Sequence, residues 1–178
     1  MNEREISSNA EWVREALERY SGPLTRYAAR ITGDVDLARD VAQDTFLRLC
    51  RADRAKVEEH LAAWLYTVCR NRALDVCRKE RRMSALHEGQ AETIACGNPG
   101  PAAVAERHET HRNVLRVLGT LPENQQEVVR LKFQEGLSYR EISDVTGFSN
   151  SNVGYLIHTA IKTIRQRLRS DTEMAQEA

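Results

Sequence analysis

The sequence has none of the short motifs that mark a catalytic or metal-binding protein. It contains no Gly-rich phosphate-binding loop, no GxSxG and no HExxH, and its paired carboxylates fall only on charged helix surfaces. Its four cysteines include no CxxC pair, and two of them sit in helical apolar patterns where any small hydrophobic residue would serve. His108 and His111 are spaced for one helix face but have no third ligand nearby. We therefore expect no enzyme, no metal site and no cofactor.

An excess of charge of one sign is also missing, as is any long apolar run. Lys and Arg total 26, and Asp and Glu also total 26, so DNA binding cannot be argued from overall basicity. No stretch approaches the roughly 18 apolar residues of a membrane span. The N-terminal sequence MNEREISSNAEW lacks the basic and then apolar order of a signal peptide. A soluble, cytoplasmic protein is the expectation.

Apolar residues at helical spacing are present instead, without the alternation of a strand. The strongest helix breakers, Gly97, Pro99, Gly100 and Pro101, cluster after the polar stretch SALHEGQAET. A length of 178 residues suits two small domains, each with a modest core. We predict an all-α protein with a helical bundle in 1–84, a flexible linker in 85–108, a helix-turn-helix bundle in 109–170 and a disordered tail in 171–178.

The second half contains the pattern of a helix-turn-helix. Ser138 and Glu141 have the spacing of a capping box, and they open a short helix that stops near Gly147. A tight turn follows, after which Ser149 or Asn150 can cap a last helix. Apolar residues recur along that helix for four turns, at Val153, Leu156, Ile157, Ala160, Ile161, Ile164 and Leu168.

The opposite side of this last helix is suited to contact DNA. If its apolar stripe faces inward, then hydrogen-bonding and cationic groups line the outside, at Ser151, Tyr155, His158, Lys162 and Arg165. A major groove accepts one helix, whose first turns touch base edges while later cations meet phosphates. The segment KTIRQRLR has four positive charges and no acidic residue. A solvated helix end is the alternative, because cations there also favour the helix dipole.

The first half separates its charges. One helix presents Asp36, Asp40, Gln43 and Asp44 on its exposed side. The next long helix ends in RNRALDVCRKERR, where six cations oppose two acidic residues, a local charge of +4. An acidic face and a basic edge on one domain favour a protein partner on one side and nucleic acid on the other. Unpatterned surface charge is the alternative.

Three segments together resemble the extracytoplasmic-function sigma factors of the sigma-70 family, and they occur in the family's order. DLARDVAQDTFLRLCR resembles the part of region 2 that binds the clamp helices of the largest polymerase subunit. AAWLYTVCRNRALDVCRKERR is similar to the reader of the promoter −10 element, and LPENQQEVVRLKFQEGLSYREISDVTGFSNSNVGYLIHTAIKTIRQRL to region 4, which reads the −35 element. The resemblance implies a region 2-like domain in 1–84 and a region 4-like domain in 109–170.

The resemblance also implies roles for individual residues. The interface with core RNA polymerase would contain Asp40, Gln43, Asp44 and Phe46, with Phe46 partly structural. The opened −10 strand, whose bases can be flipped and held, would meet Asn71, Arg72, Asp75, Arg78 and Lys79. The −35 element would meet Ser149, Ser151, Asn152, Tyr155, His158, Thr159, Lys162 and Arg165.

The recognition helix departs from the family pattern in one respect. Family members commonly place Lys or Arg early in it, where this chain has Gly154, Leu156 and Thr159. We therefore expect a different base preference and fewer phosphate contacts. Gly154 costs the helix roughly 1 kcal/mol relative to Ala, which suggests a close approach to another group, a DNA backbone being one candidate.

The function hypothesis is a sigma factor that binds core RNA polymerase and directs initiation at promoters with −10 and −35 elements. The resemblance adds an anti-sigma protein to the expected partners, because such proteins often hold these factors inactive. Two alternatives stay open at this point. One is a dimeric or ligand-sensing helix-turn-helix regulator whose first half is an effector or oligomerisation domain. The other is an antagonist that occupies polymerase without reading promoters.

Overall fold

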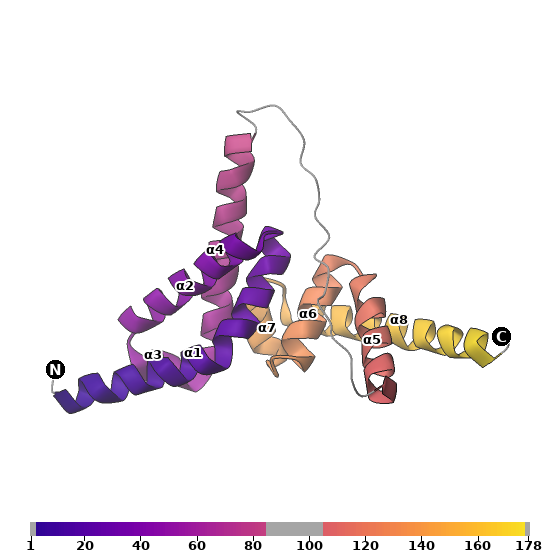
Figure 1. Cartoon of the computed structure of the whole chain (residues 1–178), viewed down its shortest axis with the longest axis horizontal. Helices are drawn as coiled ribbons and strands as arrows, with labels where there is room; N and C mark the ends of the chain where they lie inside the picture. Colours follow the sequence, from indigo (N-terminus) through magenta and orange to yellow (C-terminus); the bar gives the residue numbers. More distant parts are fainter. Residues whose placement is uncertain (1–2, 85–104, 177–178) are drawn as a thin grey trace. The chain divides into compact units, whose positions relative to one another are not determined.

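The computed structural model describes residues 3–84 and 105–176, with side chains for 9–82 and 112–170. Helices joined by short connections make up these residues, and no strand occurs among them (Figure 1), so the all-α prediction is confirmed. The chain divides into two compact units, Met1–Gly97 and Asn98–Ala178. Most of the predicted linker lies outside the described residues. No helix in the described part of the chain is long and apolar enough to cross a membrane.

The first unit is built around three long helices. Its elements are α1 (Glu3–Thr32), α2 (Val35–Arg51), α3 (Arg54–Val57), the short 3-10 helix η1 (Glu58–His60) and α4 (Leu61–Ser84). α1 packs against both α2 and α4, and α2 packs against α4. Each long helix contributes fully buried side chains to the shared core, among them Leu24 from α1, Val41 and Leu49 from α2, and Leu65 and Tyr66 from α4.

α1 runs through a proline. The two apolar sets on either side of Pro23 belong to this one helix of 30 residues, which changes direction part-way along the ribbon of Figure 1. Proline has no amide hydrogen to donate to the carbonyl four residues before it, and its ring crowds that carbonyl, so helices bend there. The bent helix contacts both of the other long helices of the unit.

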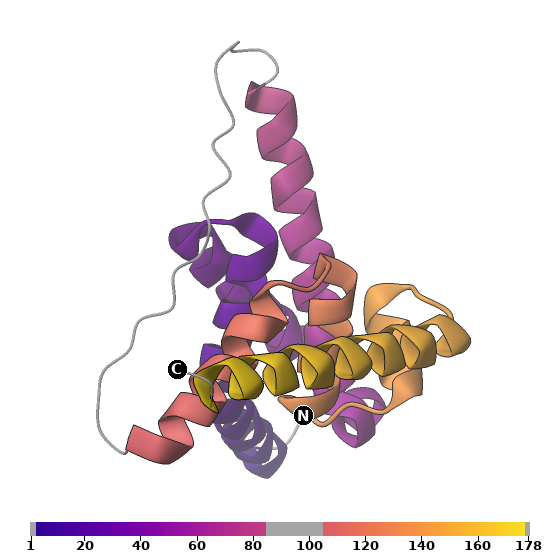
Figure 2. The ribbon, with the colours of Figure 1, turned by 90° about the vertical axis from the view of Figure 1, so that its right-hand side faces the viewer.

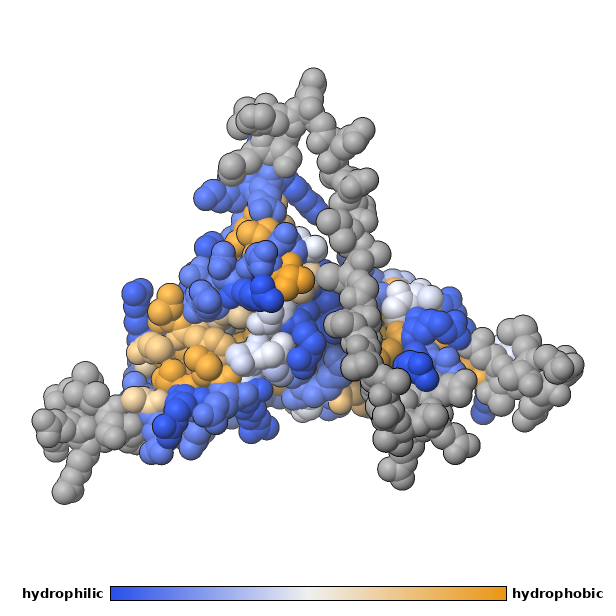
Figure 3. All heavy atoms as spheres, viewed as in Figure 1, coloured by the Kyte–Doolittle hydropathy of each residue, from blue (hydrophilic) through white to orange (hydrophobic). Residues whose placement is uncertain are grey.

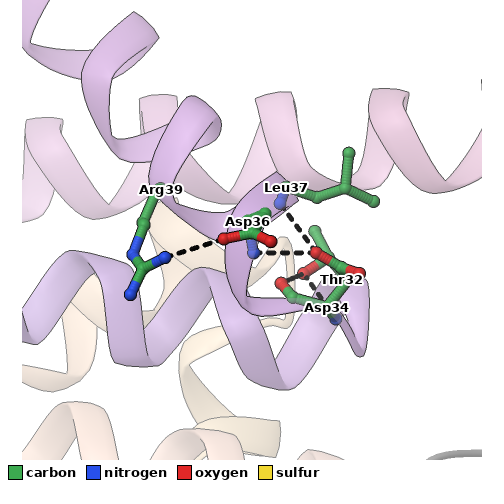
Figure 4. A network of polar contacts seen from close by, with 5 residues as sticks. All are labelled: Thr32, Asp34, Asp36, Leu37 and Arg39. Atoms are coloured by element: carbon green, nitrogen blue, oxygen red, sulfur yellow. Dashed lines mark hydrogen bonds and ion pairs between the residues drawn. The ribbon is translucent and has the colours of Figure 1, made fainter.

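A hydrogen-bonded corner reverses the chain between α1 and α2 (Figure 4). Gly33 has a φ of 73°, a left-handed conformation that suits glycine. One carboxylate oxygen of Asp34 accepts hydrogen bonds from the backbone amides of Asp36 and Leu37, each at 2.8 Å, which caps α2. The Thr32 hydroxyl donates to the Asp34 carbonyl at 2.9 Å. The corner therefore fixes where the exposed face of α2 begins.

Two thiols of α4 bond to the backbone of α1. Cys69 Sγ donates to the Leu24 carbonyl at 3.8 Å, and Cys77 Sγ donates to the Ile31 carbonyl at 3.3 Å. Burial raises the pKa of Cys69 to about 12 and also raises that of Cys77. Cys50 is exposed on α2. Among the described residues no three potential metal ligands gather, and the two α4 cysteines pack as small hydrophobic residues.

The second unit is organised by its last helix. Its elements are α5 (Ala105–Gly119), α6 (Glu123–Phe133), α7 (Tyr139–Thr146) and α8 (Asn150–Gln176). α8 packs against each of the other three and is the yellow helix that crosses them in Figure 2. The core includes Val117, Leu118, Leu121, Val129, Ala160 and Ile164. α8 extends to Gln176, into the segment 171–178 expected to be a tail, because that segment contains no glycine or proline to end a helix.

Candidate functional site

α2 presents one exposed stripe at helical spacing. Asp40 and Gln43 are exposed, and Asp44 is half-buried. Leu47 lies on the same stripe, because it follows Asp40 by seven residues and Gln43 by four, and it is 56% exposed. Phe46 is only 7% exposed and belongs to the core. The structure therefore brings together three of the four residues predicted for polymerase and adds Leu47, which the same spacing could have revealed.

Apolar surface also appears elsewhere on the first unit. In the space-filling view of Figure 3 an apolar patch interrupts the hydrophilic surface of this unit. The large apolar side chains that its described part exposes are Leu17, Val35 and Leu47. Single exposed apolar residues are ordinary on protein surfaces. Leu47 differs because it sits among polar residues already predicted to bind a partner.

The basic end of α4 presents a second stripe. Asn71, Asp75, Arg78 and Lys79 are all exposed, and their spacing places them on one helix face. Asp75 pairs with Arg78 at 2.9 Å, a contact between exposed side chains three residues apart. Such exposed pairs contribute little to stability. Arg82 lies one turn further along the same face and is also exposed, an addition to the predicted set.

Arg72 stands apart from this stripe. Its Nε lies 2.6 Å from Oδ2 of Asp44, and the two residues are 28 positions apart in the sequence. Their side chains are 38% and 40% exposed, respectively. One residue predicted to bind DNA is therefore ion-paired with one predicted to bind polymerase, across the contact between α4 and α2.

The helix-turn-helix of the second unit is held by local hydrogen bonds. The Ser138 amide donates to the Glu141 carboxylate at 2.7 Å, and the Glu141 amide donates to the Ser138 hydroxyl at 3.2 Å, which confirms the capping box. Gly147 ends α7 with a φ of 78°. The Ser149 hydroxyl accepts from the amide of Asn152 at 3.2 Å, so Ser149 is the residue that caps α8.

α8 divides its residues as the periodicity predicted. Val153, Leu156, Ile157, Ala160 and Ile164 are buried. Tyr155 is 66% exposed. Thr159 is half-buried and so is the least accessible of the predicted −35 set. The other exposed members of that set are Ser149, Ser151, Asn152, His158, Lys162 and Arg165.

The cations near the end of α8 do not all behave alike. Arg167 donates to the hydroxyl of Thr120, which follows α5, so this side chain turns toward its own unit. Lys162, Arg165 and Arg169 are exposed. The four charges of KTIRQRLR thus include one, on Arg167, whose side chain makes a contact within its own unit.

Gly154 approaches an aromatic ring of α7. A Cβ built on Gly154 would lie 3.6 Å from Cε2 and 3.9 Å from Cδ2 of Tyr139, which are ordinary van der Waals distances. Tyr139 is 41% exposed, and Lys132 Nζ lies 5.5 Å from its ring centroid. This ring is the nearest described group outside α8, and its distance leaves room for a methyl group. Tyr139 borders the start of the recognition helix, and sequence reasoning missed it.

Comparison with known proteins places both units in one family. The family model described as Sigma-70 region 2 matches residues 16–83, and the model described as Sigma-70, region 4 matches residues 111–164. The ECF RNA polymerase sigma factor EcfG of Rhodopseudomonas palustris is 31% identical over 125 residues, which are 70% of this chain and 67% of EcfG. The chain belongs to the extracytoplasmic-function group of the sigma-70 family.

A relative of similar length supports the same assignment. This sigma factor is 28% identical to the ECF RNA polymerase sigma factor SigL of Mycobacterium tuberculosis over 170 residues, which are 92% of each chain. Among solved structures, the sigma factor RpoE in complex with the anti-sigma factor NepR, from Bartonella quintana, matches with a TM-score of 0.64. At 20% identity, that match covers 89% of this chain and 97% of the other, and it supports the fold.

The family matches decide between the alternatives that the sequence alone left open. Region 2 matches residues 16–83 of the first unit, so an effector or oligomerisation bundle is set aside. The protein is a sigma factor for promoter-specific initiation of transcription by RNA polymerase.

Proposed function

We propose that three exposed helix faces divide the work of this sigma factor. The exposed stripe of α2 binds core RNA polymerase, the basic face of α4 captures the opened −10 strand, and the outer face of α8 reads the −35 element. The domains that act are then residues 1–84 and 109–170. One observation carries the proposal: most of the exposed residues in each predicted set share one face of one helix. On α8 these are Ser151, Tyr155, His158, Lys162 and Arg165, while Ser149 caps the helix, and on α4 only Arg72 lies beside the shared face.

On α2, Leu47 supplies the apolar centre of the polymerase contact, with Asp40 and Gln43 beside it. Protein interfaces combine a buried apolar centre with a polar rim, and charges at the rim steer the partner toward it. Leu47 is a little more than half exposed, so burying the rest of a leucine stabilises the complex by about 1 to 2 kcal/mol. Phe46 supports this face from the core.

On α4, Asn71, Arg78 and Lys79 contact the opened strand. Unpaired bases stack and hydrogen-bond outside the duplex, while cations follow the backbone phosphates. Asp75 orients Arg78 through its ion pair and keeps the face from being uniformly basic. Arg82 extends the same face by one more phosphate contact.

On α8, Tyr155 and His158 meet base edges in the major groove, and Lys162 and Arg165 meet phosphates. Ser149, Ser151 and Asn152 lie at the start of the helix, where hydroxyl and amide groups reach phosphates or bases. Thr159 contributes least because it is half-buried. The resulting base preference differs from that of relatives with a cation early in this helix.

We further propose that the protein has no catalytic activity of its own and works in the cytoplasm, where core polymerase and the chromosome are found. The bond-forming chemistry then belongs to the polymerase. An anti-sigma protein is a proposed partner, and the similarity in fold to RpoE, which was solved with the anti-sigma factor NepR, supports this.

The test is transcription with bacterial core polymerase on promoters whose −10 and −35 boxes are randomised. Leu47→Ala is expected to weaken the binding of core polymerase by roughly tenfold. Val35→Ala is the matched control, because Val35 is an exposed apolar residue of α2 that lies off the stripe. If the two substitutions weakened the binding of core polymerase equally, the stripe of α2 would not be part of the polymerase interface.

The same promoters test α8. The double substitution of Tyr155 and His158 by alanine is expected to abolish the preference for one −35 sequence while initiation from a strong −10 box continues. Phe133→Ala, which removes another exposed aromatic ring of the second unit, is expected to keep that preference. Retained selectivity in the double variant would mean that a different face of the protein reads the −35 element.

A further inference from the structure

The ion pair between Asp44 and Arg72 lies at the edge of a buried seam. Asp44 precedes Thr45, and Arg72 precedes Ala73, and both of these neighbours are fully buried. The Thr45 hydroxyl donates to the Val41 carbonyl at 2.8 Å, so the backbone that holds Asp44 is well fixed. Two anchored helices thus present one carboxylate and one guanidinium to each other at 2.6 Å.

The pair also lies between two binding faces. Asp44 borders the α2 stripe that contains Asp40 and Leu47, and Arg72 borders the α4 face that contains Asn71 and Asp75. The carboxylate neutralises the guanidinium at short range, so Arg72 offers less net charge to a phosphate than an arginine without a carboxylate beside it. The other ion pairs described on α4 and α2 join residues three apart within one helix, Arg78 with Asp75 and Arg39 with Asp36.

From this geometry we infer that Arg72 is a positioning residue. Its pairing with Asp44 fixes the orientation of the basic face of α4 relative to the polymerase-binding face of α2. This inference rests on the function proposed above. The −10 strand must arrive where the polymerase delivers it, so the angle between α2 and α4 determines whether Asn71, Arg78 and Lys79 meet it. Promoter opening then depends on charge complementarity between positions 44 and 72, and it does not require that the positive charge be at position 72.

Charge reversal and exchange separate these roles. Arg72→Glu and Asp44→Arg each lower formation of the open complex, by roughly tenfold, and the exchange D44R/R72E recovers most of the loss. Opening is followed by permanganate reactivity of unpaired thymines, with the sigma factor in excess so that all polymerase is occupied. The control D44R/R81E has the same net charge as the exchange but no complementary pair. Arg81 is an exposed residue of α4 outside the proposed −10 contact, so no recovery is expected.

Folding is monitored in the same samples. Both tryptophans, Trp12 and Trp64, lie in the first unit, so the urea midpoint of tryptophan fluorescence reports its stability. If a reversal unfolds this unit, the neutral variants Arg72→Gln and D44N/R72Q replace it. Arg72→Gln leaves the Asp44 carboxylate without the guanidinium and is expected to lower formation of the open complex. D44N/R72Q removes both charges and is expected to recover open-complex formation.

The outcomes distinguish the inference from the function on which it rests. An exchange variant as defective as Arg72→Glu, together with a defect in Arg78→Glu, would make Arg72 a direct DNA contact and overturn the inference alone. Wild-type protein that opens no promoter, or an Arg78→Glu variant without any defect, would refute the proposed function instead. Recovery in D44R/R72E but not in D44R/R81E, together with a defect in Arg78→Glu, supports both.

Discussion

Replacing Gly154 by alanine is expected to stabilise the second unit, although a glycine inside a recognition helix suggests a contact that forbids a side chain. A helix-interior glycine is about 0.5 to 1 kcal/mol less stable than alanine. The new methyl group would contact two ring carbons of Tyr139, at 3.6 and 3.9 Å. Each of these contacts would add about 0.1 to 0.2 kcal/mol of stability. The gain is therefore about 1 kcal/mol, or roughly 4 to 8 °C in Tm for a domain of this size.

Gly147 provides the matched control. It is also a glycine of the helix-turn-helix, but its φ is 78°, a conformation that costs an alanine about 1 to 2 kcal/mol. Gly147→Ala is therefore expected to destabilise the same unit. The pair separates backbone strain, which operates at Gly147, from helix propensity, which operates at Gly154.

The assay combines two signals on the full chain. Thermal unfolding followed by far-ultraviolet circular dichroism reports the helices of both units, whereas tryptophan fluorescence reports the first unit alone. Both substitutions should leave the fluorescence transition in place and move only the remaining circular dichroism transition. Selectivity for the −35 element should persist in Gly154→Ala.

Two results would refute the reasoning about Gly154. A loss of stability in Gly154→Ala would mean that Tyr139 cannot accommodate a methyl group at the distances observed. A gain of stability with loss of −35 selectivity would mean that the glycine serves a close approach by DNA, the candidate suggested by the sequence.

Two further predictions concern a cap and a thiol. Ser138→Ala removes the hydroxyl that accepts from the Glu141 amide and is expected to cost about 1 kcal/mol, measured as a lower Tm by circular dichroism; an unchanged Tm would mean that water replaces the cap. Burial raises the pKa of Cys69 from 9.0 to about 12, so the stability that its protonated thiol contributes is complete below pH 9 and is lost as the pH rises toward 12. Urea midpoints by tryptophan fluorescence should therefore fall more steeply above pH 9 in the wild type than in Cys69→Ala. The same dependence on pH in both proteins would contradict the raised pKa of Cys69.

Local patterns determined most of what the sequence could predict. The capping box at Ser138, the left-handed stop at Gly147 and the apolar stripe of α8 are encoded within a few residues of one another, and all three occur in the structure. The exposed stripes of α2 and α4 follow from helical periodicity in the same way. Leu47 could have been found by extending the stripe by one turn.

Contacts between distant residues could not be predicted from such patterns. Nothing near Arg72 in the sequence indicates that its partner is Asp44, 28 residues away, because that contact depends on how α2 and α4 pack. The ring of Tyr139 beside Gly154 likewise depends on the angle between α7 and α8. Phe46 was assigned partly to an interface because its burial depends on which side of α2 the other helices cover.

The two thiols that α4 donates to α1 also bear on oxidant chemistry. Peroxide attacks the thiolate, and a thiol with a pKa of about 12 is ionised in only about one molecule in 100,000 at pH 7. Cys69 is therefore nearly inert toward oxidants. Burial also raises the pKa of Cys77, which lowers the reactivity of its thiol toward oxidants. Among the cysteines with described side chains, Cys50 is the exposed one, so oxidative damage in this part of the molecule would begin on α2.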